Sequence, residues 1–157
     1  MPKPSTDKTR VLFMCLHNSA RSQMAEAWLN YLHGDQFEAR SAGLEPGTLN
    51  PLAVKVMEEV GIDISRKIPR KVFDFVTGGE LFSYVITVCD QDGAERCPHF
   101  PGFTKRMHWN FTDPATFTGS EEEKMEKIRK IRDELKEKME AWVEEAKSET
   151  IPLFNNS

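Results

Sequence analysis

The sequence predicts an α/β protein, a single domain with a four-stranded parallel sheet flanked by helices on both faces. Short apolar segments alternate with amphipathic ones, which is the order that strand–helix–strand units produce. The 157 residues suit one domain with a core of its own. Two of the apolar segments end on a cysteine, at Cys15 and Cys89. Because reactive sites of parallel sheets lie at the C-terminal ends of the strands, we expect the active site there.

The first third of the chain predicts a tail, a strand and a helix. Residues 1–9 are polar and contain proline, so we assign them to a flexible tail. The run "RVLFMC" is typical of a buried strand. Apolar residues then recur at helical spacing over residues 19–33, and Gly34 is a natural stop. A helix therefore follows the Cys15 loop directly.

The next elements continue the alternation. "FEARSAG" predicts a second strand. "NPLAVKVMEEVG" predicts a helix with Asn50 as its cap, Pro51 in its first position and Gly61 closing it. Residues 65–81 are mixed, and we interpret them as a loop with helical turns.

The last part predicts two strands and a long helix. "SYVITVC" is a third buried strand, and "TKRMHW" is a weaker fourth. Ser120 and Glu123 form a capping box before a helix whose apolar residues share one face: Met125, Ile128, Ile131, Leu135, Met139 and Trp142. We expect this helix to dock on the sheet rather than form a coiled coil. The catalytic domain then spans residues 10–148, and residues 149–157 form a flexible C-terminal tail.

Composition narrows the classes of function. The formal net charge of −4 argues against a general nucleic-acid binder. No stretch is apolar for long enough to cross a membrane, and the start lacks a secretory signal, so we expect a cytoplasmic protein. Three cysteines in a reducing compartment indicate reactive or buried thiols rather than permanent disulfides. We also expect a monomer, although no motif addresses oligomeric state.

The segment "CLHNSARS" has the features of an oxyanion site. Backbone N–H groups of the loop can turn inward, and the following helix start favours negative charge. The same field favours a thiolate at Cys15, Arg21 offers a planar fork to two oxygens, and Ser22 can donate a hydrogen bond to the sulfur or leaving group. The alternative is a buried Cys15 beside a surface Arg21. The oxyanion loop comprises Leu16, His17, Asn18, Ser19, Ala20 and Arg21.

Two further cysteines and one aspartate need an explanation. Hydrolysis of a phosphate ester requires a single thiolate, so Cys89 and Cys97 have no role in it. The polar segment "DQDGAER" between them can carry thiols that exchange disulfides, but two inert buried thiols remain an alternative. Zinc fits less well, because the gap between the two exceeds that of close ligand pairs, and we predict no metal site. Asp113 in "TDPA" is either a general acid or part of an Asp-Pro turn.

The run "VLFMCLHNSARSQMAEAWL" resembles the signature of the low-molecular-weight tyrosine phosphatase superfamily, and "HNSARSQMAE" resembles its arsenate reductase branch. The resemblance continues through "SAGLEPGTLNPLAVKVMEEVGIDIS", "VITVCDQDGAERCP" and "HWNFTDPA", and covers most of the chain up to the last helix.

The resemblance to thioredoxin-coupled arsenate reductases implies a three-thiol relay. Cys15 attacks arsenate to form a covalent arseno-cysteine, and Cys89 attacks the Cys15 sulfur and releases arsenite. Cys97 then attacks Cys89, and thioredoxin reduces the resulting disulfide. The resemblance also favours Asp113 as the general acid. No bound cofactor is implied.

Some relatives bind a potassium ion near the loop through an Asn, a Glu, a Ser and an Asp. Asn18, Glu26 and Ser41 match by position, but Arg70 stands where those relatives carry the Asp. A cation would there meet a positive side chain. We therefore doubt the potassium site, expect Arg70 to take the place of the ion, and expect Asn18 to order the loop.

Two other functions stay open. A low-molecular-weight phosphatase acting on phosphotyrosine would need only the loop and Asp113. Phosphatases of this family usually carry a tyrosine soon after the Asp-Pro pair, where this chain has Ala115 and Thr116, which disfavours aryl phosphates. The other possibility is a protein that binds an oxyanion, or is oxidised reversibly, without turnover.

Overall fold

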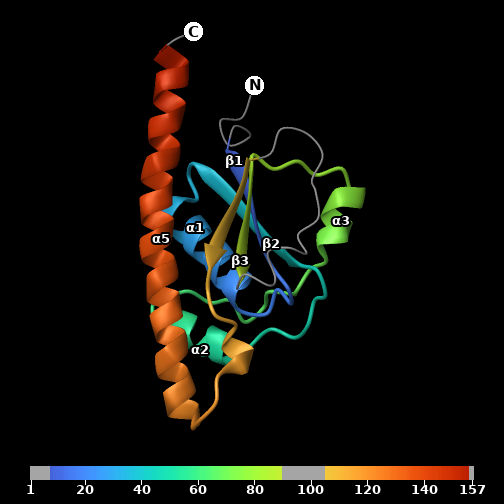
Figure 1. Ribbon diagram of the computed structural model, residues 1–157, viewed down its shortest axis with the longest axis vertical. Coiled ribbons are helices and arrows are strands. Elements are labelled where there is room, and N and C mark those ends of the chain that lie inside the picture. The colour runs from blue at the N-terminus through green and yellow to red at the C-terminus, as the bar shows by residue number, and fades with distance from the viewer. Residues whose placement is uncertain (1–7, 90–104, 156–157) are drawn as a thin grey trace.

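A computed structural model describes residues 8–89 and 105–155 of the chain (Figure 1). Its sheet has four strands in the order β2-β1-β3-β4, and each pair of neighbours is parallel. The strands are β1 Thr9–Cys15, β2 Phe37–Gly43, β3 Tyr84–Cys89 and β4 Lys105–Asn110. The predicted four-stranded parallel sheet is confirmed. Thr9, which we had assigned to the tail, belongs to β1, and residues 1–7 of that tail lie outside the described part.

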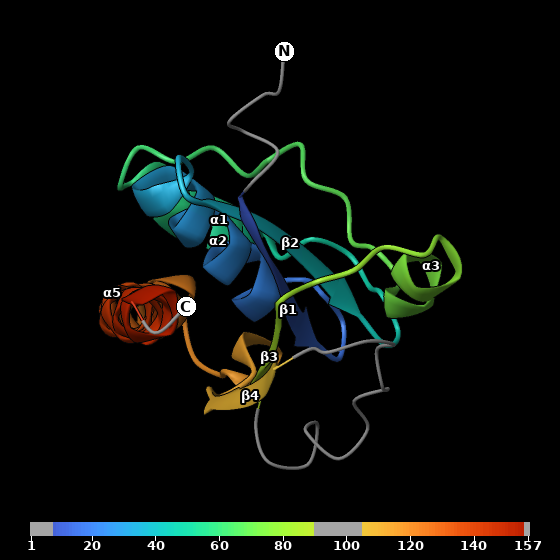
Figure 2. The ribbon, with the colours of Figure 1, turned by 90° about the horizontal axis from the view of Figure 1, so that it is seen from above.

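Helices cover both faces of the sheet, as predicted. They are α1 Arg21–His33, α2 Pro51–Glu58, α3 Val72–Thr77 and α5 Glu121–Asn155, with a short 3₁₀ turn, η2, at Pro114–Thr116. Figure 2 shows α1, α2 and α5 on one side of the sheet and α3 on the other. No helix among the described residues has the length and apolar character needed to cross a membrane.

Alternate side chains of β1 enter two separate cores, because successive residues of a strand point to opposite faces. Val11 and Phe13 belong to the larger core, beneath α1, α2 and α5. Leu12 and Met14 belong to the smaller core, which α3 closes with Phe75. These four side chains of β1 are fully buried or nearly so. The strand that ends on Cys15 is therefore fixed on both faces.

The ends of the helices follow the predicted signals with one exception. The Asn50 side chain accepts a hydrogen bond from the Leu52 amide at 2.8 Å, and Pro51 opens α2. The Ser120–Glu123 capping box forms in both directions, and the six predicted apolar residues of α5 are all buried. The exception is the C-terminus of α5. We expected a flexible tail from residue 149, but α5 is helical to Asn155, since no glycine after residue 119 ends it.

Gly43 lets the Cys15 loop pack directly on the end of β2. It pairs with Cys15 in the sheet, and its amide donates to the Arg70 carbonyl oxygen at 2.8 Å. A Cβ atom at this position would lie 2.8 Å from both the Asn18 nitrogen and the Leu16 carbonyl oxygen. Both contacts are to backbone, so neither can be relieved by a side-chain rotation. The close approach therefore requires glycine.

We predict that Gly43→Ala destabilises the protein by about 1–3 kcal/mol, because the added methyl group forces the loop away from the sheet. Urea denaturation measures the effect. The matched control is Gly47→Ala, whose added Cβ would lie 3.7 Å from the His17 Cβ, an ordinary contact. Equal free energies of unfolding for the two variants would contradict the close packing.

Charged groups join the end of α2 to α5. The Glu59 carboxylate accepts hydrogen bonds from Arg129 Nη2 at 2.9 Å and from Arg132 Nη1 at 2.9 Å. Arg132 also donates to the Val56 carbonyl oxygen, and its own carbonyl oxygen accepts from the Trp28 indole. The hydrogen bond from Arg129 is the main cause that holds the pKa of Glu59 below its ordinary value of 4.5.

We predict that Glu59→Gln lowers the free energy of unfolding at neutral pH. The difference in this free energy between variant and wild type should become smaller in acid. A carboxyl group whose pKa is lowered in the folded state stabilises the fold above its unfolded pKa and loses this effect as the pH falls through the folded value. Urea midpoints of both proteins between about pH 3 and pH 7 would show the difference shrinking below about pH 4.5. Glu58→Gln, a change at the exposed neighbouring carboxylate, is the control. A difference that stays constant with pH would exclude the carboxylate charge as its cause.

Candidate functional site

The Cys15 sulfur lies at the base of the loop that joins β1 to α1. Cys15 is 4% exposed. The Asn18 amide donates a hydrogen bond to its Sγ at 3.1 Å, and the Ser22 Oγ lies 2.9 Å from the same sulfur. The loop therefore directs an N–H donor at the sulfur and places a hydroxyl group within hydrogen-bonding distance of it. The strand before the loop and the helix after it are those that we predicted for an oxyanion site.

Asn18 is the residue that fixes the loop conformation. Its φ angle of 53° lies in the left-handed region, which asparagine adopts more readily than most residues. Its Nδ2 donates to Ser22 Oγ at 2.7 Å, and its Oδ1 accepts from the Arg70 amide at 2.8 Å and from Gln23 Nε2 at 3.1 Å. These four residues therefore connect the loop to α1 and to the segment before α3. They support the expectation that Asn18 orders the loop.

Arg21 and Asp113 face each other across the site. Arg21 is 4% exposed, and its Nη1 donates to the Phe111 carbonyl oxygen at 3.1 Å. Its Nη2 lies 3.6 Å from Asp113 Oδ2. The Asp113 side chain is 22% exposed and also accepts a hydrogen bond from the Ala115 amide at 3.0 Å, which caps η2. Asp113 thus has the Asp-Pro turn conformation and, at the same time, a position beside the guanidinium of the loop.

The other loop residues attach the loop to the chain after β2. The Leu16 carbonyl oxygen accepts from the Glu45 amide, and the Ser19 carbonyl oxygen accepts from the Asn50 amide. The His17 Nδ1 lies 2.9 Å from the Glu45 carbonyl oxygen, consistent with its interpretation as loop lining. Ala20 is buried next to the first turn of α1.

Cys89 is the last residue of β3, the strand beside β1. Because the two strands are parallel, with Met14 opposite Thr87, the backbones of Cys15 and Cys89 lie at the same edge of the sheet. The Cys89 side chain and the whole of Cys97 lie outside the described residues. The predicted exchange of disulfides among the three cysteines therefore stays a prediction.

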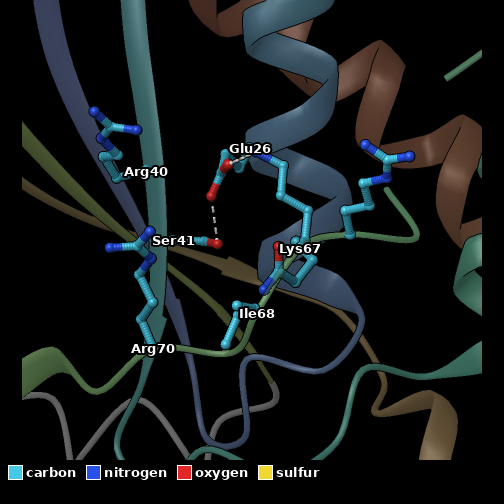
Figure 3. A pocket seen from close by; sticks show the side chains of 8 residues that line it. Glu26, Arg40, Ser41, Lys67, Ile68 and Arg70 are labelled. Carbon is cyan, nitrogen blue, oxygen red and sulfur yellow. Dashed lines mark hydrogen bonds and ion pairs between the residues drawn. The ribbon is translucent and has the colours of Figure 1, made fainter. Parts of the chain in front are cut away.

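Glu26 and Ser41, which match potassium ligands of some relatives by position, lie next to Lys67, a residue that the sequence did not single out. Ser41 Oγ donates to Glu26 Oε1 at 2.6 Å, and Lys67 Nζ donates to Glu26 Oε2 at 2.6 Å (Figure 3). Our expectation for Arg70 was wrong, because the cation at Glu26 is the ammonium group of Lys67. The Arg70 backbone amide instead binds Asn18.

The surroundings of Glu26 do not fit a free potassium ion. Glu26 and Ser41 line a pocket together with four basic residues, which are Arg40, Arg66, Lys67 and Arg70. Both carboxylate oxygens of Glu26 are already hydrogen-bonded, one of them to the Lys67 ammonium, and that ammonium would repel an added cation at the same place.

Two residues of the site escaped the sequence analysis. Gln23 is 1% exposed and donates to Asn18, and only its position one residue after Ser22 could have indicated a role. Lys67 lies in "RKIPRK", a basic segment in which sequence alone cannot tell which side chain turns inward.

Comparisons with known proteins agree with the fold and with the loop. Residues 10–151 match the family of low molecular weight phosphotyrosine protein phosphatases. An arsenate reductase of Bacillus subtilis (strain 168) is 43% identical over 138 residues, which are 87% of this chain and 96% of that protein. A solved arsenate reductase in the phosphate binding state is 30% identical with a TM-score of 0.69, over 87% of this chain and 98% of the other. A thioredoxin-dependent arsenate reductase of Corynebacterium glutamicum is 30% identical with a TM-score of 0.59, over 87% of this chain and 64% of the other.

The resemblance inferred from "VLFMCLHNSARSQMAEAWL" is thus confirmed. The family match confirms the superfamily, and the similarity to arsenate reductases confirms the resemblance to that branch. The family match extends from the start of β1 into α5 and includes the Cys15 loop, Arg21 and Asp113. The chain belongs to the low molecular weight phosphotyrosine protein phosphatase family.

Proposed function

We propose that this protein is an arsenate reductase that uses Cys15 as its nucleophile and a relay of Cys15, Cys89 and Cys97, recycled by thioredoxin. The observation that carries the proposal is that β1 and β3 are neighbouring parallel strands that both end on a cysteine, with the oxyanion loop above Cys15. Relatives named arsenate reductase, one of them thioredoxin-dependent, support the choice of substrate and reductant. We further propose that it works as a cytoplasmic monomer, where thioredoxin keeps thiols reduced.

Arsenate binds in the loop formed by residues 16–21. Backbone N–H groups and the start of α1 provide positive potential, and Arg21 offers a planar fork to two oxygens of the anion. Arg21 is buried and held by the Phe111 carbonyl oxygen, so little side-chain entropy is lost when it binds. The anion then lies above the Cys15 sulfur.

The first chemical step forms a bond between the Cys15 sulfur and arsenic. Asn18 and Ser22 stabilise the negative charge of the attacking sulfur. One oxygen of arsenate leaves, and Asp113 gives it a proton so that it departs as water. The 3.6 Å contact between Asp113 and Arg21 supports this role, because it puts the carboxyl group beside the guanidinium that would bind the anion. Arsenic is still in oxidation state five in this covalent arseno-cysteine.

The second step reduces arsenic. The Cys89 thiolate attacks the Cys15 sulfur, the sulfur–arsenic bond breaks, and its electron pair stays on arsenic, which leaves as arsenite. Arsenic gains two electrons, and the two thiols lose two as the Cys15–Cys89 disulfide forms. Cys97 then attacks Cys89 and frees Cys15, and the dithiol of thioredoxin reduces the Cys89–Cys97 disulfide.

A phosphatase acting on phosphate monoesters is the second candidate. The family match favours this activity. So does the Arg21–Asp113 pair, because Cys15, Arg21 and Asp113 suffice for a mechanism with a cysteinyl-phosphate intermediate. Ala115 and Thr116 follow the Asp-Pro pair without the aromatic side chain that would stack on a phosphotyrosine ring. We therefore place this activity second.

We predict that Cys97→Ser reduces arsenate once and then stops, because the Cys15–Cys89 disulfide has no internal thiol to resolve it. Arsenate-dependent oxidation of NADPH, coupled through thioredoxin and thioredoxin reductase, measures turnover. Wild type should turn over steadily and Cys15→Ser not at all. If wild type consumes no NADPH but hydrolyses an aryl phosphate, the phosphatase alternative holds instead.

We predict that Asp113→Asn slows arsenite release in a single turnover by about 10²–10⁴-fold, because the amide cannot donate the proton. The amide oxygen can still accept from the Ala115 amide, so the turn is retained. Rapid quenching and arsenite quantification measure the rate, and Ala115→Ser, an exposed change in the same turn that keeps the amide donating to Asp113, is the control. An unchanged rate in Asp113→Asn would exclude this residue as the acid.

A further inference from the structure

The Glu26 carboxylate is buried and needs a compensating charge. Only 8% of its side chain is exposed, at the centre of α1. Its Oε1 accepts from the Ser41 hydroxyl, a neutral donor, and its Oε2 accepts from the Lys67 ammonium at 2.6 Å. A buried carboxylate without a cation is costly, and the Lys67 ammonium supplies the compensating charge. Figure 3 shows Lys67 extending across the pocket to Glu26, while Ser41 approaches from β2.

The segment that carries Lys67 also holds the loop. Three residues further on, the Arg70 amide donates to Asn18 Oδ1 at 2.8 Å, and the Arg70 carbonyl oxygen accepts from the Gly43 amide at 2.8 Å. Asn18 in turn donates to Ser22, whose Oγ lies 2.9 Å from the Cys15 sulfur. A displacement of this segment would therefore reach the reacting sulfur through these three hydrogen bonds.

The pocket would expose oxygen ligands if the ammonium were absent. Gln23 lines the same pocket, and its Oε1 is buried and has no hydrogen-bond partner among the described residues. Together with Glu26 and Ser41 it would present three oxygens to a small cation. With Lys67 in place, the Glu26 carboxylate pairs with an ammonium that is tethered to the chain and therefore has a high local concentration.

We propose that Lys67 is a built-in cation: its ammonium group does for this chain what a potassium ion does for some relatives, and makes Lys67 a positioning residue for the Cys15 loop. Its contact with Glu26 fixes residues 67–70 against α1, so that the Arg70 amide keeps Asn18 in its left-handed conformation. Wild-type protein is therefore indifferent to potassium. The effect on turnover rests on the proposed arsenate reductase activity, but the effect on stability does not.

The test compares wild type and Lys67→Ala in potassium chloride and in tetramethylammonium chloride at equal ionic strength. We expect the same melting temperature and the same arsenate turnover for wild type in both salts. Lys67→Ala should melt lower in tetramethylammonium and turn over about 10–100-fold more slowly, because the loop is displaced. Potassium should restore much of the melting temperature and of the turnover rate of Lys67→Ala, since the ion can bind the oxygens of Glu26, Ser41 and Gln23. Tetramethylammonium is too large to do so.

Three further variants isolate the cation effect. Lys67→Arg keeps a tethered charge and should remain indifferent to potassium. Glu26→Gln combined with Lys67→Ala removes the anionic ligand and should lose the response to potassium. Lys71→Ala removes an exposed lysine of the same basic segment and should behave as wild type.

Two results would overturn the proposal. One is a wild-type melting temperature that rises specifically with potassium, which can be measured even if Lys67→Ala does not fold. The other is a loss of stability in Lys67→Ala that no small cation restores, which would make Lys67 a structural contact only. If the melting temperatures follow the expected pattern but arsenate is not reduced by any variant, the proposed function fails and the built-in cation stands.

Discussion

The site depends on the way in which the side chain of Asn18 is held. Its amide group binds Ser22, Gln23 and the backbone of Arg70, and its own backbone amide points at the Cys15 sulfur. The residue has a left-handed backbone conformation that costs energy unless surrounding contacts fix it. Those contacts come from α1 and from the chain before α3, so the geometry around the sulfur is set by elements far apart in the sequence.

The rest of the fold keeps these elements in place. β1 is buried in two cores, and the loop that follows it rests on Gly43 of β2 without an intervening side chain. α5 packs along α1 and α2, which fixes the helix whose first residue is Arg21. On the opposite side of the loop, Asp113 caps η2 and meets Arg21. The proposed nucleophile, the proposed anion-binding guanidinium and the candidate acid thus come from parts of the fold that hydrogen bonds and packing hold in place, as a preorganised site requires.

Much of this could be predicted from sequence, because the signals are local. Strands of apolar residues, the Asn50 cap and the Ser120–Glu123 box each depend on neighbours within a few positions, and all three formed as expected. The short α3 and the exact end of α5 carried no such signal. Lys67 and Gln23 were missed because their roles arise from contacts between segments. An ammonium on a flexible stem can turn to solvent or to a carboxylate, and only the position of Glu26 in space decides which.

The relay of thiols is the central claim, and one equivalent of arsenate tests it most directly. Fully reduced protein would be mixed with arsenate in the absence of thioredoxin, quenched with an alkylating reagent and mapped by mass spectrometry. The account predicts one arsenite per protein, a Cys89–Cys97 disulfide and an alkylated Cys15. Three alkylated cysteines with no arsenite released would contradict it.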